Sequence, residues 1–258
     1  MSTVTLLTKV YNNFQLKRIH KFLKSTLKGL HVEAEIYGVT PRGWTQIVVS
    51  GEDETVALRY LAEEIGFCPI RLEDVKRFSA IKGRIIDLGK SRGEFHIDIG
   101  VISPKIIDAT IPLQHLQAQL TDGRKVALKK IVELFGFCEN LPLTIKISNV
   151  DNKNNRIEAM LSEKQLIQYK NWTKSLLDRL ITVGASLPEI RLALKTAGCN
   201  RDIVSIEPLG LLEYAVVCKL GTEAPGIIPK IGKNLKNANF SIFNPREILE
   251  FLGDHLTL

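Results

Sequence analysis

The sequence predicts an α+β protein of three modules: an α/β sandwich over residues 1–75, a five-stranded β-barrel over residues 76–162, and a helical plus α+β module over residues 163–258. Two observations lead to this prediction. Segments with apolar residues at three- and four-residue steps alternate with short β-rich runs bounded by Gly, Pro and Asn. The length of 258 residues also exceeds that of one typical domain.

Composition narrows the class of protein. With 45% hydrophobic and 24% charged residues, the chain is neither disordered nor collagen-like. No apolar run approaches the ~18 residues of a membrane span, and the first residues do not form a signal peptide. The four cysteines match no CxxC pair and no disulfide framework, which favours a cytoplasmic protein. The net charge of +7 favours acidic partners such as nucleic acids.

The first module begins with a strand at residues 4–10 and a helix at residues 14–30, preceded by Asn12 and Asn13 as N-cap residues. The apolar stripe of this helix consists of Leu16, Ile19, Leu23, Leu27 and Leu30. Another face carries a cationic ridge of Lys17, Arg18, Lys21, Lys24 and Lys28. The first 31 residues contain six Lys or Arg and no acid. The ridge is therefore a candidate RNA-binding surface, although a solvated basic face is the alternative.

Two strands, residues 31–37 and 45–50, form a predicted hairpin around the Pro- and Gly-containing turn 38–43. A helix at residues 52–65 and a final strand at residues 68–72 follow. The resulting order is that of a ferredoxin-like split βαβ sandwich.

The middle module contains five predicted strands, at residues 82–88, 94–101, 107–113, 141–150 and 156–161, which suggest a small closed barrel. Residues 114–140 form a helical insertion with the apolar stripe Ala127, Leu128, Ile131, Val132 and Phe135. This stripe either caps the barrel or offers a surface to a protein partner.

The order of several short motifs in residues 81–161 resembles the S1 RNA-binding domain, which is a barrel of the OB type. These motifs are Gly83-Arg84-Ile85-Ile86-Asp87, Phe95-His96-Ile97-Asp98-Ile99-Gly100, Asp108-Ala109, Pro112-Leu113, Ile145-Lys146-Ile147 and Val150 to Ile157. With Leu209-Gly210-Leu211-Leu212-Glu213 and Cys218-Lys219-Leu220-Gly221-Thr222, the whole chain is similar to an archaeal protein family of unassigned function with an S1-like centre. The resemblance implies a cytoplasmic archaeal protein.

RNA-binding candidates within the barrel are Arg84, Lys90, Arg92 and His96. S1 domains stack bases on aromatic residues of the second and third strands, whereas here alternation places only His96 on that face, between Glu94 and Asp98. The two acids repel phosphate. We therefore expect the barrel face to contribute less to RNA binding than the cationic ridge.

The last module is predicted to contain a helix at residues 163–183, a second helix at 187–198 with Ser186 as N-cap, and a hairpin of residues 203–207 and 211–219. A helix at 224–235, a strand at 240–243 and a helix at 245–252 follow. This β-β-α-β order repeats that of residues 31–72, so a duplicated module is one interpretation.

The sequence contains no complete enzymatic motif. Gly89-Lys90-Ser91 ends like a P-loop, but Arg84 occupies the position where that motif requires Gly. There is no GxGxxG, HExxH or GxSxG and no Cys/His cluster, so no catalytic residue, metal or cofactor is predicted. Asp87 and Asp98 are read either as an acid pair or as turn caps in solvent.

The segment before residue 224 offers one further anion-binding candidate. Lys219 and Thr222 precede a predicted helix start, where free N–H groups could hold a phosphate, or Thr222 could act as a simple N-cap.

The sequence thus predicts a non-enzymatic protein that binds RNA or a ribonucleoprotein and serves translation or RNA processing. The first alternative is a protein-interaction adaptor on a transcription or ribosomal assembly, with the insertion at residues 114–140 as one contact surface. The second is an unrecognised enzyme acting on nucleotides.

Overall fold

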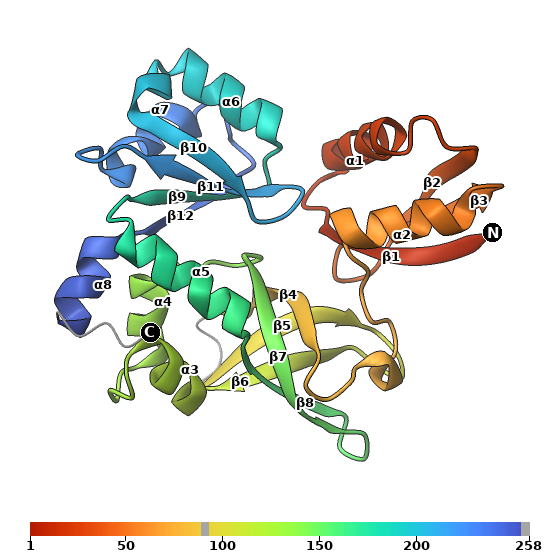
Figure 1. Ribbon diagram of the computed structural model, residues 1–258, viewed down its shortest axis with the longest axis horizontal. Helices are drawn as coiled ribbons and strands as arrows, with labels where there is room; N and C mark the ends of the chain where they lie inside the picture. Colours follow the sequence, from red (N-terminus) through yellow and green to blue (C-terminus); the bar gives the residue numbers. More distant parts are fainter. Residues whose placement is uncertain (89–92, 254–258) are drawn as a thin grey trace. The chain divides into compact units, whose positions relative to one another are not determined.

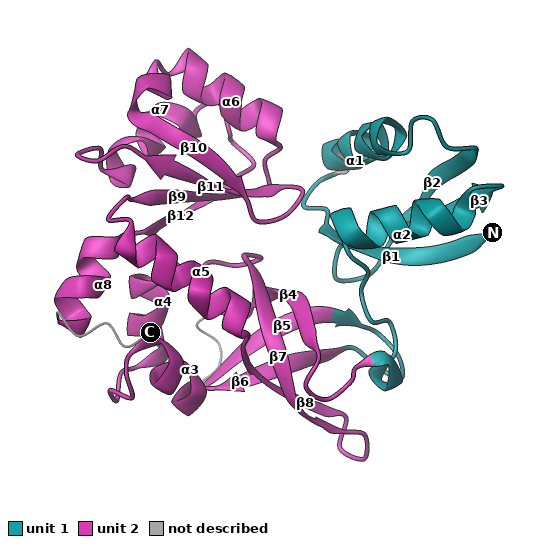
Figure 2. Cartoon of the chain, in the orientation of Figure 1, with its two compact units in different colours: residues 1–74, 100–106 teal, residues 75–99, 107–258 magenta. Residues whose placement is uncertain are grey.

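A computed structural model describes residues 1–88 and 93–253 of the chain. The chain is a mixed α+β protein with a closed five-stranded barrel and two further sheets (Figure 1). It divides into two compact units, residues 1–74 with 100–106, and residues 75–99 with 107–258 (Figure 2). Among the described residues, no helix has the length and apolar character needed to cross a membrane.

Unit 1 contains a three-stranded antiparallel sheet in the order β1-β3-β2, together with two helices. Its elements are β1 (Ser2–Lys9), α1 (Asn13–Thr26), β2 (Val32–Val39), β3 (Trp44–Gly51), α2 (Glu54–Glu64) and a 3₁₀ turn, η1 (Leu72–Asp74). Ile19 and Leu23 of α1, Leu61 of α2 and Ile47 of β3 are fully buried. These side chains form a core between the helices and the sheet, as the apolar spacing predicts.

The strand predicted at residues 68–72 is wrong. Only Phe67 forms a bridge with Leu6 of β1, flanked by hydrogen bonds from Leu7 N to Gly66 O (2.9 Å) and from Cys68 N to Thr5 O (2.8 Å). Beyond this point the backbone of Ile70 instead accepts a hydrogen bond from Ile102 N at 2.9 Å. The chain therefore leaves the sheet after three residues, because its polar groups pair with the segment that follows the second barrel strand.

The barrel of unit 2 closes in the order β4-β5-β6-β8-β7, with β7 pairing back to β4. Its strands are β4 (Ala80–Ile86), β5 (Glu94–Val101), β6 (Ile107–Pro112), β7 (Pro142–Asp151) and β8 (Arg156–Leu161). The pairing of β6 with β8 is parallel, whereas β4 pairs antiparallel with β5 and β7. All five strands lie within two residues of the predicted bounds.

The insertion between β6 and β7 forms α3 (Leu113–Leu120) and α4 (Leu128–Leu134). Of the predicted stripe, Ile131 and Phe135 are fully buried, and the Phe135 ring lies 5.6 Å from Tyr169 and 6.3 Å from Phe243. Gly136 follows at φ +61°, where an added Cβ would lie 2.7 Å from the carbonyl carbon of Ile242. The insertion thus packs inside unit 2 through Ile131 and Phe135, whereas Ala127 is exposed and Leu128 and Val132 are half-buried.

The predicted helix at residues 163–183 is wrong in its second half. The helix α5 (Glu163–Lys174) ends where Leu176 adopts φ 56°, and residues 179–183 form the strand β9 (Arg179–Val183). Every residue of β9 is buried, including the polar Arg179 and Thr182, so its sequence carries no alternation that would identify a strand.

The remaining elements complete a four-stranded antiparallel sheet in the order β10-β11-β9-β12. They are α6 (Leu187–Thr196), η2 (Cys199–Asp202), β10 (Ile203–Pro208), β11 (Glu213–Cys218), η3 (Ala224–Gly226), α7 (Ile228–Gly232), β12 (Asn239–Phe243) and α8 (Pro245–Leu252). The single helix predicted at residues 224–235 is therefore two short pieces. Helices α6 and α7 cover one face of the sheet, and α5 lies against the other (Figure 1).

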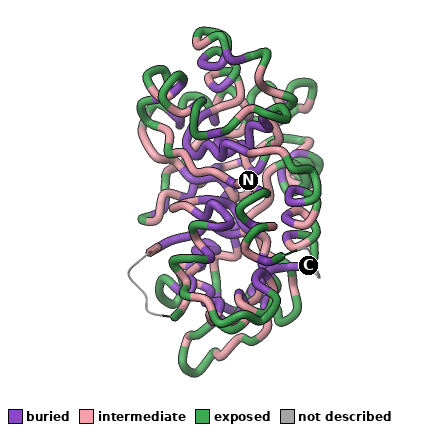
Figure 3. The backbone as a smooth tube through the Cα atoms, turned by 90° about the vertical axis from the view of Figure 1, so that its left-hand side faces the viewer, coloured by how far each residue is buried: buried purple, intermediate pink, exposed green. Residues whose placement is uncertain are grey.

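Buried segments lie mainly in the interior, and exposed segments lie mainly at the periphery (Figure 3). In unit 2, burial extends to the junction between the barrel and the four-stranded sheet. There the Arg84 Nη1 of β4 lies 2.8 Å from the Glu213 Oε2 of β11, and both side chains are at most 1% exposed. The barrel and the sheet therefore form one continuous core.

Candidate nucleic-acid interface

The cationic ridge lies on α1, whose start is fixed by a capping box. Asn12 Oδ1 accepts a hydrogen bond from Gln15 N (3.2 Å), and Gln15 Oε1 accepts one from Asn12 N (3.3 Å). Because Ile19 and Leu23 face the core, residues three and four positions apart on the other side of the helix face water. The helical spacing that turns the apolar residues of α1 toward the core therefore also turns the ridge residues toward water.

All ridge residues are exposed: Lys17, Arg18, Lys21, Lys24 and Lys28. Lys28 lies just beyond the end of α1 at Thr26, and the helix itself contains no acid. Lys24 occupies the last turn, where a cation opposes the negative end of the helix dipole. The structure therefore brings these five candidates together on one exposed surface.

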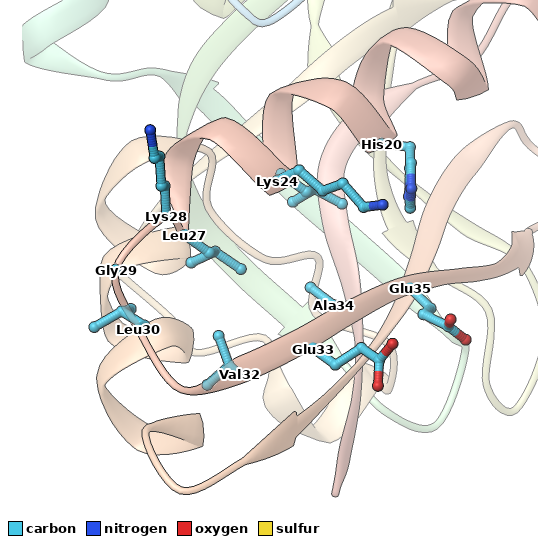
Figure 4. A pocket seen from close by; sticks show the side chains of 11 residues that line it. His20, Lys24, Leu27, Lys28, Gly29, Leu30, Val32, Glu33, Ala34 and Glu35 are labelled. Carbon is cyan, nitrogen blue, oxygen red and sulfur yellow. The ribbon is translucent and has the colours of Figure 1, made fainter.

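A groove of about 490 Å³ runs between α1 and β2 beside the ridge (Figure 4). Its helix side carries His20, Lys24 and Lys28, and its strand side carries Glu33 and Glu35. Lys28 points away from β2, and Lys24 extends toward His20 (Figure 4). The strand-side carboxylates repel phosphate, so the outer face of α1 is better suited to an anion than the groove.

The barrel candidates do not join the ridge. The His96 side chain is 23% exposed, and its Nε2 atom lies 4.0 Å from the Glu94 Oε2. Glu94 also pairs with Arg156 at 3.1 Å. Asp98 is buried and stands opposite Arg84 in the β4–β5 register, so it neither faces Asp87 across the strands nor lies in solvent. Lys90 and Arg92, with the P-loop-like segment at residues 89–91, lie outside the described residues.

Arg84 was expected at an RNA-binding face, but the structure buries it. Its guanidinium pairs with Glu213 from an element that lies far away in the sequence. A cation that is 1% exposed and already paired has no surface to offer to a phosphate. Arg84 instead links the barrel to the four-stranded sheet.

The segment containing Lys219 and Thr222 also differs from expectation. The first N–H group of the turn at Ala224 donates to Asp178 Oδ2 at 3.0 Å, and the residue before it is Glu223. Thr222 is therefore not the N-cap, and carboxylates occupy the place proposed for a phosphate. The adjoining cavity, about 40 Å³, is lined by Lys219, Thr222 and Arg246, among others.

Sequence reasoning did not single out a second group of cations. Lys82 of β4, Lys164 of α5 and Arg179 of β9 line one cleft of unit 2. No spacing along the chain indicates this group, because its members come from three separate elements. In residues 1–88 and 93–253, no three His, Cys, Asp or Glu side chains lie together as a metal site.

Comparison with solved structures finds archaeal chains that are similar only at a low level. One is a chain of the a/eIF2alpha-aDim2p-rRNA complex from Pyrococcus horikoshii OT3, with 11% identity and a TM-score of 0.26; the match covers 48% of this chain and 64% of that one. Another is the intact alpha subunit of aIF2 from Pyrococcus abyssi, with 9% identity and a TM-score of 0.26, covering 66% of this chain and 96% of that one. Such TM-scores are too low to establish a shared arrangement.

No curated protein matches the chain. Models of one protein family, in contrast, match nearly its whole length. The DUF2110 N-terminal domain matches residues 3–69, the DUF2110 central domain residues 76–173, and the DUF2110 C-terminal domain residues 177–243. The chain therefore belongs to the DUF2110 family.

Proposed function

We propose that this protein binds RNA through the cationic ridge of α1, without catalysis, and serves translation or RNA processing in the archaeal cytoplasm. One observation carries the proposal: five exposed cations share one surface of unit 1, four of them on a helix that contains no acid and Lys28 just beyond its end. From Lys17 to Lys24 the helix rises ~10 Å, which is longer than the distance between neighbouring phosphates of one strand. The spacing therefore allows several simultaneous phosphate contacts.

The barrel supports the same proposal through its topology. We assign it to the S1-like OB type, and the two outer sheets to the ferredoxin-like type. In support, the third and fifth barrel strands, β6 and β8, pair in parallel, and the fourth, β7, closes the barrel against the first, β4. In this protein the barrel face presents His96 beside Glu94, so it supplies less attraction for phosphate than α1 does.

The test measures binding of a single-stranded RNA of mixed sequence at several salt concentrations. Replacing Lys17, Lys21 and Lys24 by Glu should abolish most of the binding at moderate salt, because these residues neutralise the phosphates. If residual binding is measurable, the logarithm of its binding constant should fall less steeply with the logarithm of salt concentration. Each lost phosphate contact removes roughly 0.7 from the slope, so three lost contacts remove about 2. His96→Ala should have a much smaller effect.

The matched control replaces Lys230, Lys233 and Lys236 by Glu, which are also exposed and lie in unit 2. This variant has the same change in net charge, so equal losses from both variants would show only a general effect of charge. Absence of RNA binding by the unmodified protein at low salt would overturn the proposal and favour the adaptor. A larger loss from His96→Ala would move the site to the barrel.

A further inference from the structure

A cleft of about 590 Å³ lies where the barrel meets α5 and the edge strand β10. Its walls come from β4 and β7 of the barrel, from one side of α5, and from β9 and β10 of the four-stranded sheet. Clefts of roughly 300–1,000 Å³ are typical of small-molecule sites. The space therefore suits a ligand of nucleotide size.

Three cations and one acid line this cleft: Lys82, Lys164, Arg179 and Glu207. Lys82 Nζ donates to the backbone oxygen of Leu209, so its ammonium is held at the junction of β4 with the end of β10. Lys164 is exposed in the first turn of α5. The lining therefore carries an excess of positive charge at a site that is partly withdrawn from water.

Arg179 forms the floor of the cleft and is fixed in place. Its guanidinium lies 4.9 Å above the Trp172 ring and donates to Leu177 O and Ser175 Oγ, both at 2.9 Å. The only acid of the lining, Glu207, lies 3.6 Å from Arg179. Glu207 therefore offsets the charge of Arg179 and leaves Lys82 and Lys164 as the principal anion-binding groups.

The surroundings of Lys82 disfavour its positive charge. Burial, together with the charges of Arg84 and Lys164, lowers the pKa of Lys82 to about 8, while the charge of Glu213 opposes the shift. A bound anion would favour the charged form of this amine. A negative ligand therefore stabilises the ammonium form of Lys82.

The other lining groups suit the remainder of an organic phosphate. Thr144, Gln168 and Asn171 supply polar side chains, and Ile167, which is 50% exposed, supplies an apolar surface on α5. Inorganic phosphate alone would occupy a small part of such a cleft. A phosphate joined to a larger polar and apolar group matches the lining better.

We propose that this cleft binds the phosphate of a nucleotide, with Lys82 and Lys164 contacting the phosphate and Arg179 adding charge from the floor. The site consists of residues of unit 2 alone, shares no residue with the cationic ridge of unit 1, and does not depend on RNA binding by that ridge. The phosphate can belong to a free nucleotide or to an RNA strand, and the experiment separates these sources.

The test titrates the full-length protein with adenosine monophosphate, with adenosine as the ligand that lacks phosphate, and measures heat by calorimetry. We expect saturable binding of the monophosphate and none of adenosine. Lys82→Gln and Lys164→Gln should each weaken binding by about tenfold or more, since each removes a charge-assisted contact. Lys164 is exposed, so its replacement tests the site even if Lys82→Gln folds poorly. The matched control is Lys174→Gln, on the same helix but outside the cleft, which should bind normally.

A pH series gives a second signature. Affinity should fall as the pH rises above about 8, because free Lys82 loses its proton there, and this fall should vanish in Lys82→Gln. Absence of saturable binding, or binding that both cleft substitutions leave unchanged, would overturn the proposal. Displacement of the monophosphate by single-stranded RNA is measured in the triple variant Lys17→Glu, Lys21→Glu and Lys24→Glu. Displacement assigns the phosphate to RNA, and lack of displacement assigns it to a free nucleotide.

Discussion

The first sheet, β1-β3-β2, and the last sheet, β10-β11-β9-β12, follow the same path along the chain. In each, a strand, a helix, a hairpin and a second helix come in this order, and the first strand pairs with the third. They differ in the fourth strand. β12 pairs with β9 over five positions, from Asn239 to Phe243, whereas the first sheet has only the bridge between Leu6 and Phe67 at that place.

The two sheets also differ in the charge of their first helices. α1 contains no acid and carries most of the cationic ridge, whereas the corresponding α6 has Glu189 in its first turn and Arg191 and Lys195 as its cations. The face of the last sheet that is turned away from α6 is covered by α5 and the barrel. Two sheets with the same strand order therefore present different surfaces. What each module can bind depends on its surface and not on its topology.

The largest effect is expected at the ion pair that anchors the last sheet. Arg84→Met leaves the carboxylate of Glu213 buried without this cation, so the free energy of unfolding of unit 2 should fall by about 3–5 kcal/mol. Denaturant unfolding followed by circular dichroism measures the change. The control is Lys129→Met, which removes an exposed pair with Glu133 at 3.9 Å and should cost less than about 0.5 kcal/mol. Similar costs for the two variants would contradict a joined core in unit 2.

The second prediction compares the two fourth-strand positions directly. Phe243 of β12 is fully buried, with ring centroids 5.1 Å from Trp172 and 6.0 Å from Tyr169, so Phe243→Ala should cost ~3 kcal/mol of unfolding free energy. Phe67 is partly exposed, and Phe67→Ala should cost about half as much, because less apolar surface returns to water. Equal losses would show that the single bridge stabilises unit 1 as well as a complete strand stabilises unit 2.

The sequence predicted the barrel strands well because each is bounded by turn residues and keeps an alternating or strongly β-rich pattern. It failed at β9, since Leu166, Tyr169 and Leu180 continue a helical spacing across the end of α5. A central strand that is buried on both faces has no polar alternation to distinguish it from a buried helix. Without β9, the shared order of the two outer sheets was visible only in part.

The same limit applies to the candidate site. The cationic ridge could be predicted because its residues lie on α1 or, for Lys28, directly after it, where spacing along the chain places them together. Arg84 was expected at the surface because its partner Glu213 belongs to a different element, and tertiary packing alone decides their contact. The cleft of Lys82, Lys164 and Arg179 was missed for the same reason.

The smallest expected difference is in how often the two sheets open locally in the unmodified protein, which the reactivity of one cysteine in each sheet reports. Cys68 follows the bridge of the first sheet, is 7% exposed and donates to Leu6 O at 3.4 Å, whereas Cys218 of β11 is fully buried. Burial, together with the negative charges of Asp178 and Asp202, raises the pKa of Cys218 to about 11.

Alkylation requires an exposed thiolate, so the rate for each cysteine in the native protein reports how often its surroundings open. Because the first sheet has no complete fourth strand beside β1, we expect Cys68 to react at least about tenfold faster than Cys218, which corresponds to ~1.4 kcal/mol in opening free energy. Iodoacetamide at pH 8, with the modified peptides quantified by mass spectrometry, measures both rates in one sample. Rates measured in denaturant give the intrinsic reactivity of each thiol. Dividing each native rate by this value leaves the effect of local opening. If Cys218 reacts as fast as Cys68 after this correction, the extra strand and the covered second face of the last sheet confer no local stability, and the difference between the two sheets is one of surface charge alone.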